Sequence, residues 1–482
     1  MVLINLGGGQ PDSTGCQKSP LQLFKVDRSY NTKTRVTKRT IAVGEAFGLG
    51  IEDQRRFSIF TNFQIEIKPG QVVLITGDSG SGKSTLLNEI SSQLSSGKCE
   101  DFKGRLVSNS SIRIPEDELI IEGVGRDISE AISVLSMSGL NEAFLMLRKF
   151  RELSDGQKYR YRVARMIDSG AETWIFDEFA ALLDRVTAKC VSYTIQKTAR
   201  KLRRTLVVAT THEDLLQDLK PDIWIQKKFG DQVSVTEFSS DSFDRRCTLL
   251  KDIKIEPCSM GEIRHLEQFH YRGGLSNLVK FSFKAELNGE VVGALVAVPP
   301  HLQLKGRNLA LPQFRGRSSV EMAKKINREI VRIARVIVAP KFRSIGLGAE
   351  MVRKTMPLMN TKYVEALAVM AKYNSFFESA GMQRVNVEGD EREERDVKEL
   401  ETLGFRAELL PSRKHVESVA EKLDRRGLEV CKKFALRYCA VAKRRRESLI
   451  PRIKRLDRAA IVDALTLRTS RPVYLYWRNP LL

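Results

Sequence analysis

The chain has 482 residues, a formal net charge of +21 and a hydrophobic content of 42%. This length exceeds what one hydrophobic core usually serves, so it predicts two or three domains, and no apolar run approaches the roughly 18 residues of a membrane span. Seven cysteines without a CxxC pair argue against a disulfide framework or a zinc ribbon and, with an N-terminus that lacks a basic start and an apolar core, predict a cytoplasmic protein without a membrane partner.

The positive charge is concentrated in the C-terminal half. Residues 1–250 hold 35 Lys and Arg against 32 Asp and Glu, a net charge of +3, whereas residues 251–482 hold 45 against 27, a net charge of +18. A basic excess of this size predicts contact with a polyanion, RNA or DNA, through the second half. A basic surface without a partner is the alternative.

The first 70 residues carry few signals. Residues 1–40 are polar, with one expected strand at 21–26, and residues 40–68 read as strands and turns. Pro69-Gly70 then predicts a tight turn that leads into the apolar run Val72 to Ile75. We expect that run to be a buried strand.

A glycine-rich loop follows this strand and leads into an apolar helix. The order strand, GxxxxGK[ST], helix is that of a phosphate-binding loop. Backbone N–H groups and the helix N-terminus would surround the phosphates, Lys83 would reach the β- and γ-phosphates, and the Ser84 hydroxyl would bind Mg²⁺. The expected ATP-binding residues are Gly77, Asp78, Ser79, Gly80, Ser81, Gly82, Lys83, Ser84 and Thr85.

Four further motifs follow in order. They are Leu153-Ser154-Asp155-Gly156-Gln157, the strand Trp174 to Glu178, the tetrapeptide Ala181 to Asp184, and the strand Thr205 to Ala209 followed by His212. With the phosphate loop, they resemble the signature, Walker B strand, D-loop and switch histidine of the ABC-type ATPases. The resemblance covers about residues 41–238.

The resemblance implies a role for each motif residue. Asp177 would hold Mg²⁺, Glu178 would act as general base toward the attacking water, and His212 would contact the γ-phosphate region. Phe47 is the candidate for stacking on adenine, and an ordinary core phenylalanine is the alternative. The signature residues Ser154, Gly156 and Gln157 would contact ATP held by a second protomer, so the resemblance implies an ATP-dependent head-to-tail homodimer.

Three features depart from that family. Asp155 stands where the signature usually has glycine, and the segment from about Asp127 to Leu153 is short. No glutamine lies between Gln93 and the signature, so Glu122 is the nearest substitute for the missing Q-loop residue. With no membrane span, these features favour a mechanochemical or regulatory ATPase over a transporter subunit.

The second half begins after a linker at 239–250. Two alternating runs, Val279 to Leu287 and Glu290 to Val298, flank Asn288-Gly289 and predict a hairpin. The strand Ile330 to Val338 runs into a loop and a helix that resemble motif A of the GNAT acyltransferases. The resemblance implies that acetyl-CoA binds through Arg343, Ser344, Ile345, Gly346, Leu347 and Gly348, with Asn374 as a further contact.

The acyl-transfer chemistry has several candidate residues. His270 is the candidate base, in a His-Tyr-Arg sequence that resembles phage Mom-type relatives, and a helix-capping histidine is the alternative. Phe377 stands where the family usually has a tyrosine acid, so Tyr373, Tyr271 or water would have to substitute.

The predicted fold is α/β, a P-loop ABC-type ATPase domain followed by a GNAT-like mixed α/β domain with a basic helical insertion. The expected function is an ATPase coupled to an acyl-CoA-dependent N-acyltransferase that acts on a nucleic acid. The alternatives are a nucleic-acid-binding ATPase with an inactive acyltransferase fold, and a protein or small-molecule N-acetyltransferase regulated by the ATPase. The expected segments are an N-terminal extension at 1–40, the ATPase at 41–238, the linker at 239–250, the GNAT-like core at 251–388, the insertion at 389–471 and a closing strand at 472–482.

Overall fold

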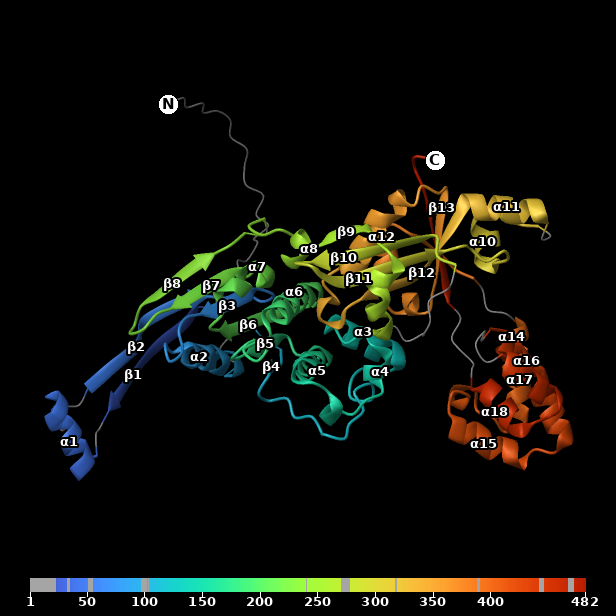
Figure 1. Cartoon of the computed structure of the whole chain (residues 1–482). Coiled ribbons are helices and arrows are strands. Elements are labelled where there is room, and N and C mark those ends of the chain that lie inside the picture. The colour runs from blue at the N-terminus through green and yellow to red at the C-terminus, as the bar shows by residue number, and fades with distance from the viewer. Residues whose placement is uncertain are drawn as a thin grey trace, which may run out of the picture. The chain divides into compact units, whose positions relative to one another are not determined.

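The fold is taken from a computed structural model of the chain (Figure 1). The chain divides into two compact units, the first formed by residues 1–277, 282–295 and 335–354, and the second by residues 278–281, 296–334 and 355–482. Within the part of the chain that is described, no helix has the length and apolar character needed to cross a bilayer. The structure describes residues 23–32, 35–50, 55–96, 102, 104–239, 241–269, 278–316, 319–387, 391–441, 446–466 and 472–482.

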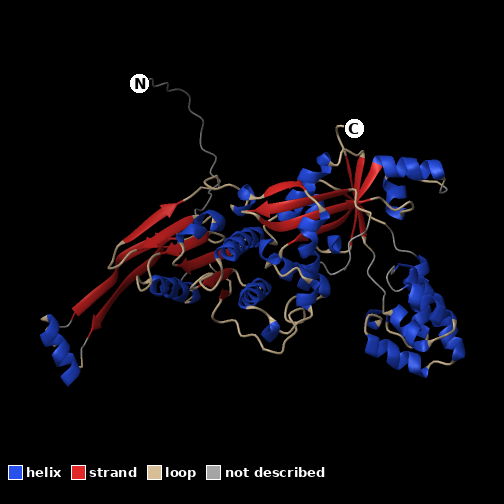
Figure 2. Ribbon diagram, in the orientation of Figure 1, coloured by secondary structure: helices blue, strands red, loops and turns tan. Residues whose placement is uncertain are grey.

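The first unit is built on a six-stranded sheet of order β4-β5-β6-β3-β7-β8 (Figure 2). Its strands from β4 to β7 are parallel, and β8 is antiparallel to β7. Because the carboxyl ends of parallel strands share one edge, the segments after β3, β5 and β6 meet there. The strands are β3 (Val72–Thr76), β4 (Leu106–Ser108), β5 (Thr173–Phe176), β6 (Thr205–Thr210), β7 (Ile223–Lys227) and β8 (Val233–Glu237).

The central strand β3 confirms the prediction made from its apolar run. All five residues of β3 are buried, as expected for a parallel strand covered on both faces. Helix α2 (Lys83–Ser95) begins directly after the phosphate loop. Its Leu86 and Leu87 pack into one core with Val73 of β3 and Val207 of β6.

An antiparallel hairpin precedes the sheet, made of β1 (Leu23–Thr32) and β2 (Arg55–Glu66). The expectation of only strands and turns at 40–68 is wrong, because helix α1 (Lys38–Phe47) joins the two strands. Thr37 and Thr40 form a capping box at its start, and Gly48 ends it at a φ of 64°. Figure 1 shows α1 at the end of the hairpin far from α2.

A small helical part lies between β4 and β5 in the sequence. It contains α3 (Ile128–Met137), α4 (Ala143–Met146), the 3-10 helix η1 (Phe150–Glu152) and α5 (Asp155–Asp168). Helix α6 (Arg185–Leu202), capped by Asp184, then leads to β6. Short helices η2 (Glu213–Leu215) and α7 (Leu216–Leu219) follow β6.

The predicted linker is packed against the first unit. Cys247 is fully buried, and the buried carboxylate of Asp218 accepts hydrogen bonds from the backbone N–H and the hydroxyl of Thr248 at 2.8 and 2.6 Å. Lys220 donates to the carbonyl of Arg246 at 3.0 Å. Residues 246–248 are therefore held to α7 and to the residue that follows it by specific contacts.

A seven-stranded sheet follows, with the order β14-β15-β13-β12-β11-β10-β9. The hairpin predicted around Asn288-Gly289 is confirmed, since both residues have positive φ, 50° and 84°, between β10 and β11. Strands β12 and β13 are parallel. The strands are β9 (Lys254–Pro257), β10 (Phe281–Leu287), β11 (Glu290–Val298), β12 (Ile330–Val338), β13 (Tyr363–Ala368), β14 (Gln383–Val385) and β15 (Val473–Arg478).

Short helices connect these strands. They are α8 (Leu249–Asp252), α9 (Met260–Ile263), η3 (Arg264–Phe269), α10 (Lys305–Ala310), η4 (Pro312–Phe314), α11 (Val320–Glu329), η5 (Pro340–Phe342), α12 (Leu347–Leu358), η6 (Met370–Lys372) and α13 (Phe376–Ser379).

The segment between β14 and β15 forms helices with a core of their own. Phe434 is fully buried in it, with Val430 and Leu436 packed alongside, so the packed face predicted from helical spacing is confirmed. The helices are α14 (Glu391–Thr402), η7 (Ala407–Leu409), α15 (Arg413–Lys422), α16 (Arg425–Val441), α17 (Arg446–Lys454) and α18 (Arg458–Leu465).

Candidate functional site

The phosphate loop between β3 and α2 curls tightly because three of its glycines have positive φ. The φ angles are 147° at Gly77, 78° at Gly80 and 105° at Gly82. A Cβ atom on Gly77 would lie 2.0 Å from the backbone oxygen of Lys227, and one on Gly82 would lie 2.5 Å from Cγ2 of Ile59. Glycine is therefore required by neighbouring atoms at Gly77 and Gly82, and by backbone conformation at Gly80.

Lys83 closes the loop on itself. Its ammonium donates to the carbonyl oxygens of Gly77 and Asp78 at 2.8 and 2.7 Å. Burial lowers the pKa of Lys83 below its ordinary value, while the nearby carboxylates of Asp177 and Asp78 oppose that shift. The ammonium is thus held beside the backbone of the loop, where phosphate oxygens could replace the two carbonyls.

The two expected metal ligands lie side by side. The hydroxyl of Ser84 donates to Oδ1 of Asp177 at 3.1 Å, and the N–H of Glu178 donates to the same oxygen at 2.9 Å. In the part of the chain that is described, no group of three or more His, Cys, Asp or Glu side chains could hold a metal alone. One hydroxyl and one carboxylate fit Mg²⁺ that takes its other ligands from phosphates and water.

Glu178 and His212 follow two neighbouring parallel strands. Glu178 is exposed, with a φ of 49°. The next residue, Phe179, is tied to β6 at both backbone groups, since its N–H donates to Ala209 at 2.9 Å and its carbonyl accepts from the Thr210 hydroxyl at 3.1 Å. The N–H of His212 donates to the same hydroxyl at 3.2 Å. The ends of β5 and β6 are therefore linked beside both predicted residues.

Asn109 is a site residue that the sequence analysis missed. It follows β4, and its amide donates to the backbone carbonyl of Asp177 at 3.1 Å while its Oδ1 accepts the N–H of Asp177 at 3.3 Å. Glu122, the expected Q-loop substitute, instead lies in a turn closed by its N–H to the Leu119 carbonyl. An amide side chain directly after a short apolar strand was the signal that could have identified Asn109.

Phe47 lies at the end of α1 with 74% of its surface exposed. Tyr30 of β1 and Phe57 of β2 are register partners, and each is about half exposed. Ile59, which lies against Gly82, stands at a register shift between the two strands and is buried, whereas Phe57 is exposed.

The signature caps helix α5. The Ser154 hydroxyl accepts the N–H of Gln157 at 3.4 Å, and Oε1 of Gln157 accepts the N–H of Ser154 at 3.0 Å. A Cβ on Gly156 would find only Cδ2 of Leu183, at 3.8 Å, so no atom of its own chain requires glycine there. Ser154 and Asp155 are exposed. The helix start is therefore open to an approaching group.

In the loop after β12, some of the residues predicted to bind acetyl-CoA contact other residues of the chain instead. Arg343 forms an ion pair with Glu142 at 3.1 Å, and the Ser344 hydroxyl donates to the carbonyl of Ser136 at 2.9 Å. Ile345 and Leu347 are buried. The N–H groups of residues 344–348 make no hydrogen bond to any described residue, and Gly346, at a φ of 99°, is exposed.

The other acyltransferase predictions concern Asn374, Phe377 and His270. Oδ1 of Asn374, in the second unit, accepts the N–H of Phe376 at 3.1 Å and begins α13. Phe377 is buried, with 6% of its surface exposed. His270, the candidate base, and Tyr271 lie outside the described residues.

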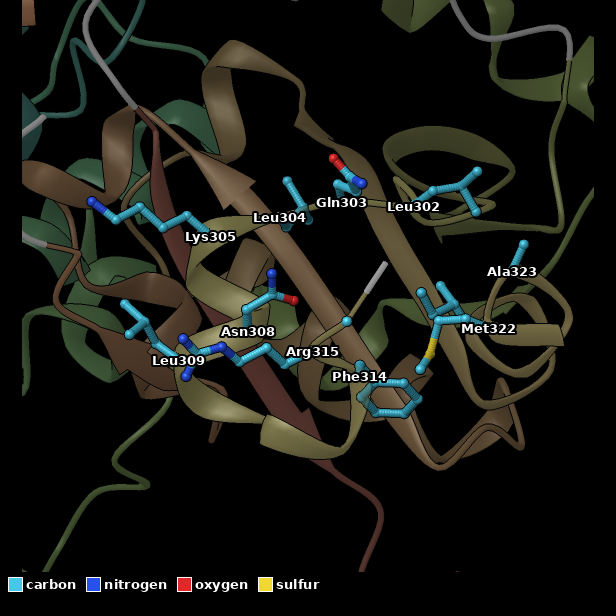
Figure 3. A pocket seen from close by; sticks show the side chains of 12 residues that line it. Leu302, Gln303, Leu304, Lys305, Asn308, Leu309, Phe314, Arg315, Met322 and Ala323 are labelled. Carbon is cyan, nitrogen blue, oxygen red and sulfur yellow. The ribbon is translucent and has the colours of Figure 1, made fainter. Parts of the chain in front are cut away.

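The second unit contains a cavity of about 530 Å³ between α10 and α11 (Figure 3). Lys305 and Arg315 are its cationic lining residues, Gln303 and Asn308 supply amides, and no carboxylate lines it. No predicted site residue lines it. The remaining lining residues are Leu302, Leu304, Leu309, Phe314, Gly316, Met322, Ala323 and Ile326.

Helix α10 beside this cavity is held by a buried ion pair. Arg307 donates to both carboxylate oxygens of Glu365 on β13, at 2.9 and 2.7 Å, and both side chains are almost fully buried. The hydroxyl of Tyr474 on β15 donates to Glu365 at 3.2 Å. The three groups thus connect one helix with two strands.

Many cations of the C-terminal helices are paired with acids. Lys433 pairs with Glu399 at 3.1 Å, and Arg452 pairs with Asp457 at 2.7 Å. Arg413 pairs with both Glu417 and Asp463. Of the basic run at 443–446, residues 443–445 lie outside the described residues.

Known proteins resemble the first part of the chain. The family described as ABC transporter matches residues 60–181. The cytochrome c biogenesis ATP-binding export protein CcmA of Vibrio parahaemolyticus is 31% identical over 193 residues, which is 35% of this chain and 90% of that protein. The CcmA protein of Pseudomonas aeruginosa is 28% identical over 189 residues, which is 34% of this chain and 90% of that protein.

A solved structure of the ATP-binding cassette MJ0796, dimeric and bound to ADP and Pi, is 18% identical with a TM-score of 0.32, and the match covers 44% of this chain and 98% of that one. Because a relative that is 31% identical is matched over nine tenths of its length, this chain belongs to the ABC transporter ATPase family.

Proposed function

We propose that the chain hydrolyses ATP at the edge of the first sheet, in the cytoplasm. The observation that carries this proposal is the 3.1 Å contact between Ser84 and Asp177, with Glu178 following directly. The loop amides and Lys83 bind the phosphates, and Ser84 and Asp177 hold the magnesium ion. Mg²⁺, when bound, neutralises charge on the β- and γ-phosphates.

Glu178 takes a proton from the attacking water in this proposal, and His212 lies at the γ-phosphate. The base stacks on the exposed ring of Phe47, at the end of α1. Asn109 holds the Asp177 backbone through two hydrogen bonds and so positions the metal ligand.

We also propose that two chains pair head to tail around two ATP molecules. Gly156 supports this, because among the described residues a Cβ there would meet only Cδ2 of Leu183, at an ordinary contact distance of 3.8 Å. A glycine that the described residues of its own chain do not require fits close approach by a ligand. Ser154 and the α5 N-terminus then face the γ-phosphate held by the other protomer.

Gel filtration of a Glu178→Gln variant tests this pairing, because blocked hydrolysis traps the ATP-bound state. We expect a dimer at saturating Mg-ATP and a monomer without nucleotide. A variant that binds ATP and elutes as a monomer would refute the pairing. The double variant Lys83→Ala with Glu178→Gln is the control that stays monomeric.

A second proposed function is acyl-CoA-dependent N-acyl transfer by the seven-stranded sheet. Its support is that β12 pairs with β13 over Ile330–Ile333 only, although β12 continues to Val338. Parallel strands that separate, followed by a loop with free N–H groups and helix α12, suit a pyrophosphate. The acceptor in this proposal is a nucleic acid.

Equilibrium dialysis with labelled acetyl-CoA tests the cofactor. Gly346→Asp places a carboxylate among the free N–H groups, whereas Gly346→Asn changes shape equally without the charge, and both residues tolerate positive φ. We expect weaker binding for the aspartate variant alone. Equal binding by both variants, or none by the parent chain, would rule out this site.

The nucleic-acid acceptor is tested by incubating labelled acetyl-CoA with total RNA, DNA and protein, with and without ATP. Label in a nucleic acid supports the proposal. Label in protein points to a protein acetyltransferase instead, and no transfer despite acetyl-CoA binding points to an acyltransferase fold without activity. Binding to the basic half would weaken steeply between 50 and 200 mM salt.

A further inference from the structure

A buried arginine connects the signature helix with the loop after β12. Arg160 lies on α5 with 6% of its surface exposed. Its guanidinium donates to the carbonyl oxygens of Gly139 at 3.3 Å, Pro340 at 3.2 Å and Lys341 at 3.2 Å. All four residues belong to the first unit. Burial lowers the pKa of Arg160, and the three carbonyls are the partners that compensate its charge.

Two more side chains fasten the same loop to the same helical part. The ion pair between Arg343 and Glu142 is largely buried, with 11% and 21% of the side-chain surfaces exposed. The Ser344 hydroxyl donates to Ser136, near the end of α3. Arg343 also donates to the carbonyl of Val338 at 3.0 Å, the last residue of β12. Residues between Ser136 and Arg160 therefore contact the loop at Pro340, Arg343 and Ser344 through hydrogen bonds and an ion pair.

Helix α5 also reaches the hydrolytic edge of the sheet. The signature residue Ser154, six residues before Arg160, caps its N-terminus, and the hydroxyl of Tyr159 accepts the N–H of Ala180, two residues after Glu178, at 3.2 Å. A single rigid helix of 14 residues thus contacts the signature, the segment after Glu178, and the loop at 340–341. These are the physical contacts that coupling between two sites requires.

We propose that Arg160 is a positioning residue that couples ATP at the signature to the conformation of the loop at 340–344. When ATP draws Ser154 toward a partner protomer, α5 moves with it, and Arg160 carries the Pro340 and Lys341 carbonyls along. This inference rests on the proposed nucleotide function, and it does not depend on acyl transfer. By linkage, a ligand bound at the loop changes ATP affinity by the same factor.

Hydrogen exchange of peptides covering 340–350 tests the coupling in the full chain carrying Glu178→Gln, with and without Mg-ATP. We expect ATP to change exchange in these peptides by about fivefold or more. Adding Arg160→Met should abolish that ATP-dependent change. Adding Arg162→Met, an exposed neighbour on α5, should preserve it. A purely structural role for Arg160 would alter exchange equally with and without ATP.

The outcomes are separated by measuring ATP binding directly with a fluorescent analogue. If ATP binds and the loop peptides do not respond, or Arg160→Met keeps the response, the coupling is refuted while the nucleotide function stands. If ATP does not bind, both are refuted. Should Arg160→Met fail to fold, Arg160→Gln keeps a polar side chain that is too short to donate to the Pro340 and Lys341 carbonyls, and an unchanged ATP response in that variant refutes the coupling.

Discussion

Glycine is required at Gly77 by a neighbouring backbone atom and at Gly80 by the backbone conformation, and substitutions can test this difference. Gly77→Ala would place a methyl group 2.0 Å from the Lys227 backbone oxygen, whereas Gly80 has no heavy atom within 4 Å of that position. We expect Gly77→Ala to lower the melting temperature and abolish ATP binding. Gly80→Ala should cost about 1–2 kcal/mol, the price of a left-handed alanine. Thermal unfolding and nucleotide titration of both variants measure the contrast.

If the two variants lost equal stability, the close approach of β7 to the loop at Gly77 would be wrong.

A substitution at Gly156 distinguishes a role in the fold of its own chain from a role in contact with a second chain. Because its nearest neighbour is 3.8 Å away and it lies in a helix, alanine should leave the fold intact or raise the melting temperature, since alanine favours helix by about 0.8–1 kcal/mol. ATP hydrolysis should fall about 100-fold, as expected from a displacement near 1 Å at a reacting group. Steady-state phosphate release and thermal melts give the two quantities. If Gly156→Ala hydrolysed ATP at the parent rate, the signature would not be part of the ATP site.

The site residues that the sequence predicts are those that stand in a recognisable motif of a few consecutive residues. Lys83, Ser84 and Asp177 follow strands at spacings that phosphate and metal chemistry require, so they were recognisable without coordinates. Asn109 reaches Asp177 only because β4 pairs with β5. The amide after β4 marks Asn109 as a polar residue at a strand end, but its partner Asp177 follows only from the pairing of β4 with β5, which the whole sheet sets.

Among the elements, α10 depends on one buried ion pair. Arg307→Met leaves the Glu365 carboxylate buried without its cation, and we expect a loss of about 3–5 kcal/mol in the second unit. The double variant Arg307→Met with Glu365→Gln should recover part of that loss, because the buried charge is gone. Chemical denaturation of the three proteins gives the comparison. A single variant as stable as the parent would show that the pair is not buried in solution.

Elements with strong local signals were predicted and those with weak signals were not. The Asn288-Gly289 turn specifies its hairpin because both residues accept positive φ. Helix α1 was missed because it is short and buries only Gly44, so it lacks an apolar stripe, and its capping threonines occur equally in turns. The predicted linker proved packed because Thr248 donates hydrogen bonds to Asp218 of α7 and the Arg245 carbonyl accepts one from the Tyr193 hydroxyl of α6.

At the scale of the whole molecule, the net charge of +18 in residues 251–482 predicts a polyanion partner, and this stays a prediction. Many cations of the C-terminal helices are paired with neighbouring acids, but such pairs leave the net excess of positive charge unchanged. Contacts such as Arg160 with Lys341 join residues 181 positions apart within the first unit, so they were outside the reach of motif reasoning.

The most direct test of the account is complementation between two inactive chains. Lys83→Ala removes the phosphate-loop cation and Gly156→Ala obstructs the signature, so each variant alone should hydrolyse ATP at background rate. In a head-to-tail dimer, an equimolar mixture forms heterodimers with one intact composite site, so its rate should rise well above both backgrounds. The upper limit is about a quarter of the parent rate, reached when all pairings are equally stable. A mixture that stays at the sum of the two backgrounds would contradict the composite site.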